Sequence, residues 1–392
     1  MRKLALGILE RARQGQKLWW KLRGLTPEGV AEQRSVSGVA WEEFCDTLKA
    51  AGASLKFPGT PQDPFSQAEG YRYLGRLARA GLEAFLEDAD PKAPMLHRVV
   101  HETVKMGADN PDNYYQNAAI SGAHEYRIVG HRGTVSYLGF GTQAGHYGQG
   151  GGMPPTGYLE ASELELGENG ELEIFLSCTP RPKNWLKMTP ETGTLIVRQT
   201  FLDRSTETHA DLRIERIDGP HQPGPITPAM VDEGLKSAST LVAGASLLFA
   251  KWARDFQKHT NELPRFDPEV SNAAGGDPNI AYYHSHWRLA PDEALVIDVS
   301  PPRCEHWNFQ LNNHWMESLD YRFFRIHVNK HTAVAAPDGS VRIVVAHEDP
   351  GLPNWIQTVG HESGTMCFRW VRAESQPVPA TRVVKLAELL AR

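Results

Sequence analysis

Residues 163–174 read ELELGENGELEI, and this stretch carries the clearest fold signal in the chain. Charged and apolar residues alternate in Glu163–Leu166 and again in Glu171–Ile174, so each run has one apolar and one wet face. Between them, Gly167-Glu168-Asn169-Gly170 supplies the glycines and the asparagine of a tight turn. The stretch therefore predicts two antiparallel strands joined as a hairpin, with one face packed on a core.

The same period of two recurs through the middle and the end of the chain. Tyr126–Val129 and Thr134–Phe140 flank His131-Arg132-Gly133, which has the composition of a hairpin turn. Further strands are expected at Thr194–Phe201, Asp211–Ile217, Tyr282–Leu289, Ala294–Val299, Trp307–Asn312, Phe323–Val328, Thr332–Ala335, Val341–Ala346 and Thr365–Val371. So many short strands predict two packed antiparallel sheets, a jelly-roll-like β-sandwich.

Residues 1–110 show the spacing of three and four between apolar residues that is typical of helices. The segments Trp41–Ala51 and Ala68–Glu87 carry it most clearly. The first twenty residues are predicted to form a short amphipathic helix, because the apolar run Leu4–Leu9 is too short for a secretion signal and no cleavage site follows.

The longest helix is predicted at Pro228–Asn261. Thr227 is a suitable N-cap, Pro228 stands at the first helical position, and Pro264 follows the end. Apolar residues recur along one face of this segment. A stripe of this length must be covered, either by the sandwich or by a second copy of the chain in a homo-oligomer.

These patterns predict a mainly β protein with helical additions, an α+β chain in four parts. A helical N-terminal region occupies residues 1–110 and a first β block residues 111–225. A long helical insertion follows at 226–265, and a C-terminal β block at 279–390. The two β blocks are expected to share one sandwich.

The composition excludes several classes of function. The 392 residues include 41 Lys and Arg against 47 Asp and Glu, a formal charge of −6 without a basic cluster, so no nucleic-acid partner is expected. No run of about 18 apolar residues occurs, so no membrane partner is expected. The four cysteines, Cys45, Cys178, Cys304 and Cys367, are scattered, which favours reduced thiols and a cytoplasmic location.

One part of the chain resembles a known family. The likeness lies in Trp287–Pro377 and consists of His306-Trp307-Asn308-Phe309, Asp338-Gly339-Ser340, Asn354-Trp355 after Pro350, and Phe368-Arg369-Trp370. These motifs are similar to those of a bacterial family of domains of unknown function, number 1214. The resemblance implies a jelly-roll-type β-sandwich and brings no settled reaction with it.

The densest polar stretch is Arg303–Arg325. Asn308, Gln310 and Asn312 alternate within it, so their amides share one face of a strand. Amides are costly to bury without partners, so this row faces solvent, lines a wet pocket or ties neighbouring loops together.

The same stretch could carry general acid–base chemistry. Glu317 and Asp320 are three residues apart and would lie together if the segment turns helically. Two carboxyl groups beside indoles are typical of glycosidases, although both could instead pair with Arg322 or Arg325. The remaining candidates are His306 and His314 as proton shuttles, Arg322 as the anion holder, Asn308, Gln310 and Asn312 as substrate-binding amides, and Trp307, Trp315 and Trp355 as apolar walls.

Two further groups were singled out by their residue types. His284 and His286 lie on one face of a predicted strand, so a divalent metal is a candidate cofactor there, with His347, His361 or Glu317 as further ligands. No cofactor is predicted firmly. Asn110–Tyr115, with Tyr126-Arg127, forms a polar and aromatic group at the junction of helical region and sandwich, where pockets tend to form.

Two functions remain open at this stage. The first is an enzyme, a hydrolase or lyase, that acts on a small organic molecule or glycoside by general acid–base chemistry in a Trp-lined pocket. The alternative is a non-catalytic β-sandwich that binds a carbohydrate or a lipophilic ligand. Either form could assemble as a homo-oligomer through the 228–261 helix.

Overall fold

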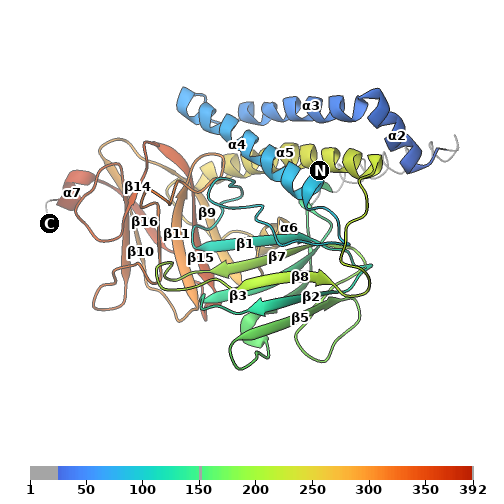
Figure 1. Ribbon diagram of the computed structural model, residues 1–392. Coiled ribbons are helices and arrows are strands. Elements are labelled where there is room, and N and C mark those ends of the chain that lie inside the picture. The colour runs from blue at the N-terminus through green and yellow to red at the C-terminus, as the bar shows by residue number, and fades with distance from the viewer. Residues whose placement is uncertain (1–24, 150–151, 391–392) are drawn as a thin grey trace.

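The computed structural model describes residues 25–149 and 152–390, and its strands lie beneath a layer of helices (Figure 1). Within these residues, sixteen strands form four sheets of four strands each. The chain is therefore mainly β with helical additions, as the alternating patterns predicted. The amphipathic helix expected over the first twenty residues lies outside the described part of the chain.

The first eight strands form one β-sandwich. They are β1 (Asn113–Ala119), β2 (Tyr126–His131), β3 (Tyr137–Ala144), β4 (Pro155–Glu160), β5 (Glu171–Ser177), β6 (Trp185–Lys187), β7 (Thr192–Thr200) and β8 (Asp211–Arg216). One sheet has the order β1-β7-β3-β4 and the other β6-β5-β2-β8. Ile128, Phe140, Ile174 and Val197 are completely buried between them, so this sandwich has a core of its own.

The last eight strands form a second sandwich. They are β9 (Ile280–Arg288), β10 (Glu293–Val299), β11 (His306–Asn312), β12 (His327–Asn329), β13 (Val341–Ala346), β14 (Trp355–Gln357), β15 (Ser363–Val371) and β16 (Ala380–Lys385). Their sheets have the orders β12-β11-β15-β9 and β14-β13-β10-β16. Phe309, Ile297, Ile343 and Phe368 belong to its separate core.

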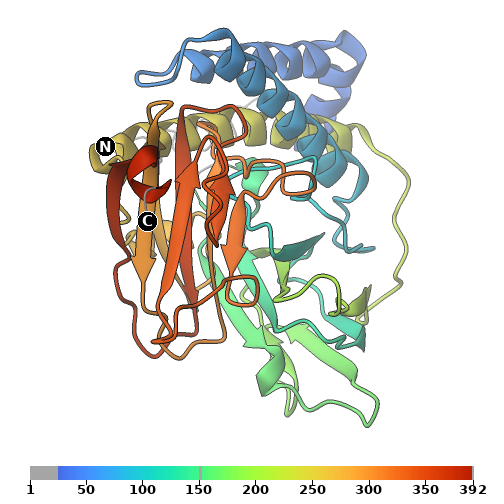
Figure 2. The same cartoon turned by 90° about the vertical axis from the view of Figure 1, so that its left-hand side faces the viewer.

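The expectation of one sandwich shared by both β blocks was wrong. Each block supplies enough alternating apolar residues to close two sheets on a core of its own. The two sandwiches lie side by side, as Figure 2 shows, and the polar faces of the β1-β7-β3-β4 and β12-β11-β15-β9 sheets meet. The jelly-roll connectivity stays a prediction.

Helices α2 to α5 are gathered along one side of the molecule (Figures 1 and 2), whereas α6 and α7 lie beside the strands. The α-helices are α2 (Pro27–Ser37), α3 (Val39–Ala51), α4 (Pro64–Leu82), α5 (Pro228–Phe256), α6 (Pro268–Ala273) and α7 (Leu386–Leu390). Single helical turns are η1 (Gly52–Lys56), η2 (Glu83–Glu87), η3 (Tyr147–Gln149), η4 (Ala161–Glu163) and η5 (Gln257–His259). In the described ranges, no helix combines the length and the apolar character needed to cross a membrane.

Helix α5 confirms the prediction made from the Thr227-Pro228 start. The Thr227 hydroxyl accepts a hydrogen bond from the Met230 amide at 3.2 Å, and Pro228 opens the first turn. The helix packs on α3 and α4 with one part of its surface and on β9 and β15 with another. Its apolar stripe is therefore covered within the chain, and burial does not require a second copy.

Both hairpins predicted from local patterns were wrong. Glu163–Leu166 is not a strand. Glu163 ends the helical turn η4, and its carboxylate accepts a hydrogen bond from the Glu160 backbone amide. The Asn184 side chain then bonds both the backbone amide and the carbonyl of Glu165. The turn at His131-Arg132-Gly133 connects β2 and β3, but these strands belong to opposite sheets. Local alternation identified strands without identifying their partners.

Candidate functional site

A cavity of about 130 Å³, partly open to solvent, lies where the two sandwiches and helix α5 meet. Its walls come from β1 and β7 of the first sandwich, from β9 and β15 of the second, and from Phe249 and Trp252 of α5. The polar wall residues are Asp109, Asn110, Asn113, Tyr115, Asn117, Tyr147, Arg198, Ser271, Tyr282, His284 and Arg369. The volume is close to that of cavities that hold a benzene-sized molecule, about 150 Å³.

Two buried arginines dominate the chemistry of this cavity. Arg198 on β7 is 7% exposed and Arg369 on β15 is 3% exposed. Within the described residues, their guanidinium groups donate hydrogen bonds to neutral oxygens: Arg198 to the Gly275 carbonyl, and Arg369 to the Ala108 carbonyl and the amides of Asn308 and Gln310. Burial opposes the charged form of Arg198, but the nearby buried Asp277 carboxylate raises the pKa of Arg198 overall. That carboxylate does not contact the guanidinium group, so an anion would be favoured beside it.

Each arginine lies opposite a tyrosine on the neighbouring strand. Tyr115 pairs with Arg198 across β1 and β7, and Tyr282 pairs with Arg369 across β9 and β15. Burial raises the pKa of Tyr115, while the positive charges of Arg369 and Arg198 both oppose that increase. The two guanidinium groups therefore act on the same small volume.

Two further polar groups on the wall lack partners in the described part of the chain. The Tyr147 hydroxyl, on η3, makes no hydrogen bond there, and the same holds for Nδ1 of His284. The His284 ring is stacked on Phe256 and on Tyr282 at 5.6 Å from each ring centroid. Burial lowers the pKa of His284 to about 3, so its imidazole is neutral at pH 7.

His286 and His314 are also buried in a neutral form. Burial lowers the pKa of His286 to about 4 and that of His314 to about 3. The unfolded chain binds a proton on such residues below about pH 6.5, whereas the folded chain does so only near these lowered values. Each residue therefore makes folding less favourable as the pH falls from about 6.5 towards its folded pKa.

The variant His314→Gln is expected to change this pH dependence. Between pH 6 and pH 5, the slope of unfolding free energy against pH should become shallower by about 1.4 kcal/mol per pH unit, because one proton is no longer taken up on unfolding. Urea denaturation at several pH values measures the slope. His259→Gln is the control, since His259 is exposed, and an unchanged slope for the His314 variant would contradict the assignment.

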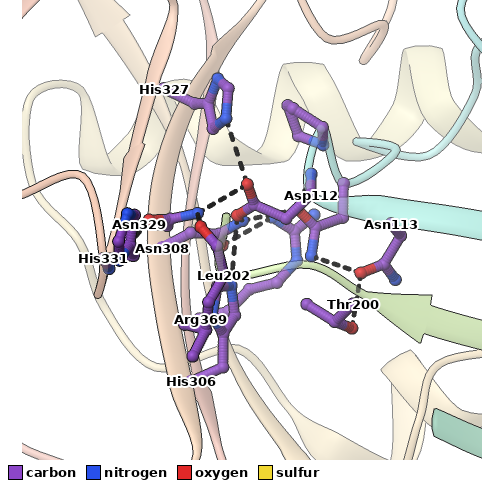
Figure 3. Close-up of polar contacts among 12 residues, drawn as sticks. Asp112, Asn113, Thr200, Leu202, His306, Asn308, His327, Asn329, His331 and Arg369 are labelled. Carbon is purple, nitrogen blue, oxygen red and sulfur yellow. Dashed lines mark hydrogen bonds and ion pairs between the residues drawn. The ribbon is translucent and has the colours of Figure 1, made fainter. Parts of the chain in front are cut away.

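A second polar network joins the sandwiches beside the cavity (Figure 3). Asp112, just before β1, is 2% exposed and accepts hydrogen bonds from Asn308 at 2.8 Å and from Asn329 at 2.9 Å. Its carboxylate also contacts Nε2 of His306 at 3.1 Å and of His327 at 3.2 Å. Burial alone would raise the pKa of Asp112, but the His327 and His306 contacts lower it well below its usual range.

This network shows what the row of amides on β11 does. Asn308, Gln310 and Asn312 share one buried face, as predicted, opposite the core residues Phe309 and Leu311. Asn308 bonds Asn110 and Asp112, and Gln310 bonds the Asp109 carbonyl at 2.8 Å. None of these three side chains lines the cavity described above. The geometry therefore supports the alternative in which the amide row ties neighbouring loops together.

Glu317 and Asp320 do not form an acid–base pair at the cavity. Glu317 is 1% exposed, and its carboxylate binds Arg76 of α4 at 2.5 Å and Asn313 at 2.9 Å. Asp320 lies at the surface and forms a two-pronged ion pair with Arg322. The segment is a tight loop in which Asn313 bonds the Glu317 carbonyl, so the helical spacing assumed in the prediction does not apply.

We expect Glu317 to matter for stability. Burial raises the pKa of Glu317 against the opposing effect of Arg76, but the carboxylate still closes a buried ion pair between α4 and the second sandwich. Glu317→Ala should lower the free energy of unfolding by about 3 kcal/mol, because Arg76 and Asn313 lose their acceptor. Asp320→Asn, at an exposed pair, should cost less than about 1 kcal/mol. Equal losses in urea denaturation would be inconsistent with this difference.

The other predicted site residues are dispersed. Trp307 is in the core of the second sandwich, Trp315 packs under α4, and Trp355 is partly buried with its indole bonded to the Ala346 carbonyl. His306 is occupied by Asp112, and His314 lies edge-on to Trp315. These three tryptophans do not line a common pocket, because Trp307 faces the core from β11, Trp315 lies in the loop after β11, and Trp355 belongs to the other sheet.

The predicted metal pair was also not completed. His284 lies in an aromatic stack, and His286 contacts the Thr260 hydroxyl at 3.0 Å. Within residues 25–149 and 152–390, no three His, Cys, Asp or Glu side chains are grouped so as to hold a metal ion. His361 is engaged elsewhere, with Glu69 at 2.9 Å.

The cavity was only partly foreseen from the sequence. The group Asn110–Tyr115 was expected near a pocket, and Asn110, Asn113 and Tyr115 do line the cavity. The sequence patterns do not indicate Arg198, and they indicate Arg369 only as part of a family motif. The available signal was the similarity of ETGTLIVR at 191–198 to ESGTMCFR at 362–369, which a search for internal repeats would have found.

The fold and the cavity together define a class: a double β-sandwich protein with an arginine-lined cavity under a helical layer. The family model of the protein of unknown function DUF1214 matches residues 290–375, within the second sandwich. The resemblance that the sequence motifs indicated is therefore confirmed for the C-terminal part of the chain.

One solved structure extends the similarity beyond the matched domain. An uncharacterised protein from Burkholderia cenocepacia shares 53% identity with this chain at a TM-score of 0.89, covering 91% of this chain and 99% of that one. A protein from Vibrio parahaemolyticus has a TM-score of 0.46 and 12% identity, covering 81% of this chain and 98% of that one. Among curated proteins, no significant match to this chain is found.

Proposed function

We propose that this protein binds a small organic anion in the cavity between its two sandwiches. The observation that carries the proposal is the pair of buried guanidinium groups, Arg198 and Arg369, whose hydrogen bonds to described residues all go to neutral oxygens. Carboxylates are the natural partners of such groups, because the planar guanidinium donates two parallel hydrogen bonds. Phe249 and Trp252 offer an apolar surface for the body of the ligand.

The geometry favours binding over the hydrolase or lyase reaction predicted from sequence. That reaction was assigned to Glu317 and Asp320, and neither carboxylate lines the cavity. Among the described residues, Asp109 is the one acidic side chain of the wall, and its carboxylate is engaged by the Ser318 backbone amide at 2.9 Å and hydroxyl at 2.8 Å. A cytoplasmic location and assembly through the 228–261 helix also remain proposals.

Isothermal titration calorimetry with small carboxylates tests the proposal. Tyr147→Phe removes a hydroxyl that has no partner in the described chain, so affinity should fall about tenfold while stability stays within about 0.5 kcal/mol. Ala274→Leu should weaken binding by filling the cavity. Arg322→Gln is the control, because Arg322 is an exposed cation outside the cavity.

Either of two results would overturn the proposal. If the wild-type protein binds none of the carboxylates at millimolar concentration, the cavity is not an anion site. The same conclusion follows if Arg322→Gln weakens binding as much as Tyr147→Phe does, because binding would then occur at the surface.

A further inference from the structure

The two sandwiches repeat one another strand for strand. In each, the first, seventh, third and fourth strands form one sheet in that order, and the sixth, fifth, second and eighth form the other. The fifth and sixth strands are parallel in both. The sequence supports this equivalence, since ETGTLIVRQ at 191–199 corresponds without a gap to ESGTMCFRW at 362–370. Arg198 and Arg369 are therefore equivalent residues of an internal repeat.

The loops that enter the first strand of each repeat are equivalent as well. In the first repeat, the Asn110 backbone amide donates to the Tyr115 hydroxyl at 3.0 Å, and the side-chain oxygen Oδ1 of Asn110 accepts from the Asp112 backbone amide at 3.0 Å. In the second, the Asp277 amide donates to the Tyr282 hydroxyl at 3.2 Å, and Asp277 Oδ1 accepts from the amide two residues on at 2.9 Å. The two tyrosines of the cavity thus hold matching positions.

The arginines cross between the repeats in a reciprocal way. Arg198 of the first repeat donates to the Gly275 carbonyl, in the loop before the second repeat begins. Arg369 of the second repeat donates to the Ala108 carbonyl, in the loop before the first repeat begins. A contact made by one residue and returned by its equivalent is the mark of an approximate two-fold axis, and here that axis passes through the cavity.

We infer that the cavity takes a linear dianion, a short dicarboxylate, with one carboxylate at Arg198 and the other at Arg369. This inference rests on the proposed function and names its ligand class. A monocarboxylate can contact only one of the two equivalent guanidinium groups. A chain of about two to four carbons fits the volume, since these dicarboxylates have about six to eight non-hydrogen atoms and similar cavities hold about six or slightly more.

The test compares acids of equal length by isothermal titration calorimetry. Acetate, propionate and butyrate are titrated beside oxalate, malonate and succinate, with sulfate and phosphate as inorganic dianions. The best dicarboxylate is expected to bind about 10- to 100-fold more tightly than the monocarboxylate of the same length, because a second charge-assisted pair forms. Arg198→Gln and Arg369→Gln should each reduce it to the affinity of the monocarboxylate.

Variants at equivalent positions keep the inference testable if an arginine variant fails to fold. Asn117 and His284 occupy corresponding places on β1 and β9 and line opposite parts of the wall. Asn117→Leu and His284→Phe should each weaken the dicarboxylate severalfold, and by similar factors, if both ends of the ligand are held. A loss in only one variant would show that a single end is engaged.

The outcomes separate this inference from the proposed function. Equal affinities for mono- and dicarboxylates, with a loss on Tyr147→Phe, would overturn the dicarboxylate and leave the anion site in place. Tighter binding of sulfate or phosphate than of any dicarboxylate would overturn it too. Absence of binding by every anion would remove both the inference and the proposed function.

Discussion

Replacing Asp112 with alanine should lower the free energy of unfolding by about 5 kcal/mol, the largest effect expected for one residue outside the two cores. Its carboxylate contacts four side chains of the second sandwich, including Asn308 and Asn329. Removal would leave those buried donors without an acceptor, at about 1–3 kcal/mol for each unsatisfied group and about 3–5 kcal/mol for a broken buried charge pair. Because these costs are not additive, we take a value near the upper end.

Urea denaturation measures this loss, and two variants make it specific. Asp112→Asn keeps the volume and one acceptor, so it should cost less than the alanine variant but more than about 1 kcal/mol. Asp338→Ala is the control, because Asp338 is an exposed turn residue that bonds only Ser340 nearby. A loss below about 2 kcal/mol for Asp112→Ala would show that the network does not hold the sandwiches together.

Trp315→Ala should destabilise the protein by about 4 kcal/mol. The indole is 1% exposed, belongs to the core between α4 and the second sandwich, and donates to the Ser66 carbonyl at 2.9 Å. Deleting a buried indole leaves a cavity and an unpaired carbonyl, and costs of about 3–5 kcal/mol are usual for such changes. The sequence predicts Trp315 as a wall of a substrate pocket, whereas its contacts link the second sandwich to the helical layer.

The packing around Trp315 offers an independent check. A Cβ atom on Gly70 would lie 2.8 Å from the indole carbon Cζ2, so α4 can approach the ring only because residue 70 is glycine. Gly70→Val should therefore destabilise the protein without altering Trp315. Trp355→Ala, at a partly buried indole, is the control and should cost clearly less. If both tryptophan variants lose the same amount, the proposed role of Trp315 is wrong.

The sequence predicted most single elements well and their associations poorly. Two predicted strands were wrong, since Thr332–Ala335 is not a strand and Phe323–Val328 is one only from His327. Thr194–Phe201 and Trp307–Asn312 are strands as expected, because their alternation reflects one face turned to a core. Strand β1 was missed, since Asn113–Ala119 contains few apolar residues and contributes mainly to the interface between sandwiches. A period of two identifies a strand, but it carries no information about which distant strand lies beside it.

The candidate site shows the same limit, because the sequence does not tell which distant residues lie together. The amide row on β11 was correctly placed on one face, yet its partners Asn110 and Asp112 lie about two hundred residues earlier in the chain. Glu317 and Asp320 are close in sequence but point to different surroundings, because the intervening loop is not helical. Arg198 and Arg369 dominate the chemistry of the cavity, and in the sequence only a comparison of the two halves of the chain connects these two residues.

The most direct test of the account is a high-resolution crystal structure of the protein grown with the carboxylate that binds most tightly in solution. We expect density for that ligand between Tyr115 and Tyr282, with carboxylate oxygens about 3 Å from guanidinium nitrogens of Arg198 and Arg369. A cavity that contains only water, while the ligand occupies a surface site at a concentration that saturates binding, would contradict it.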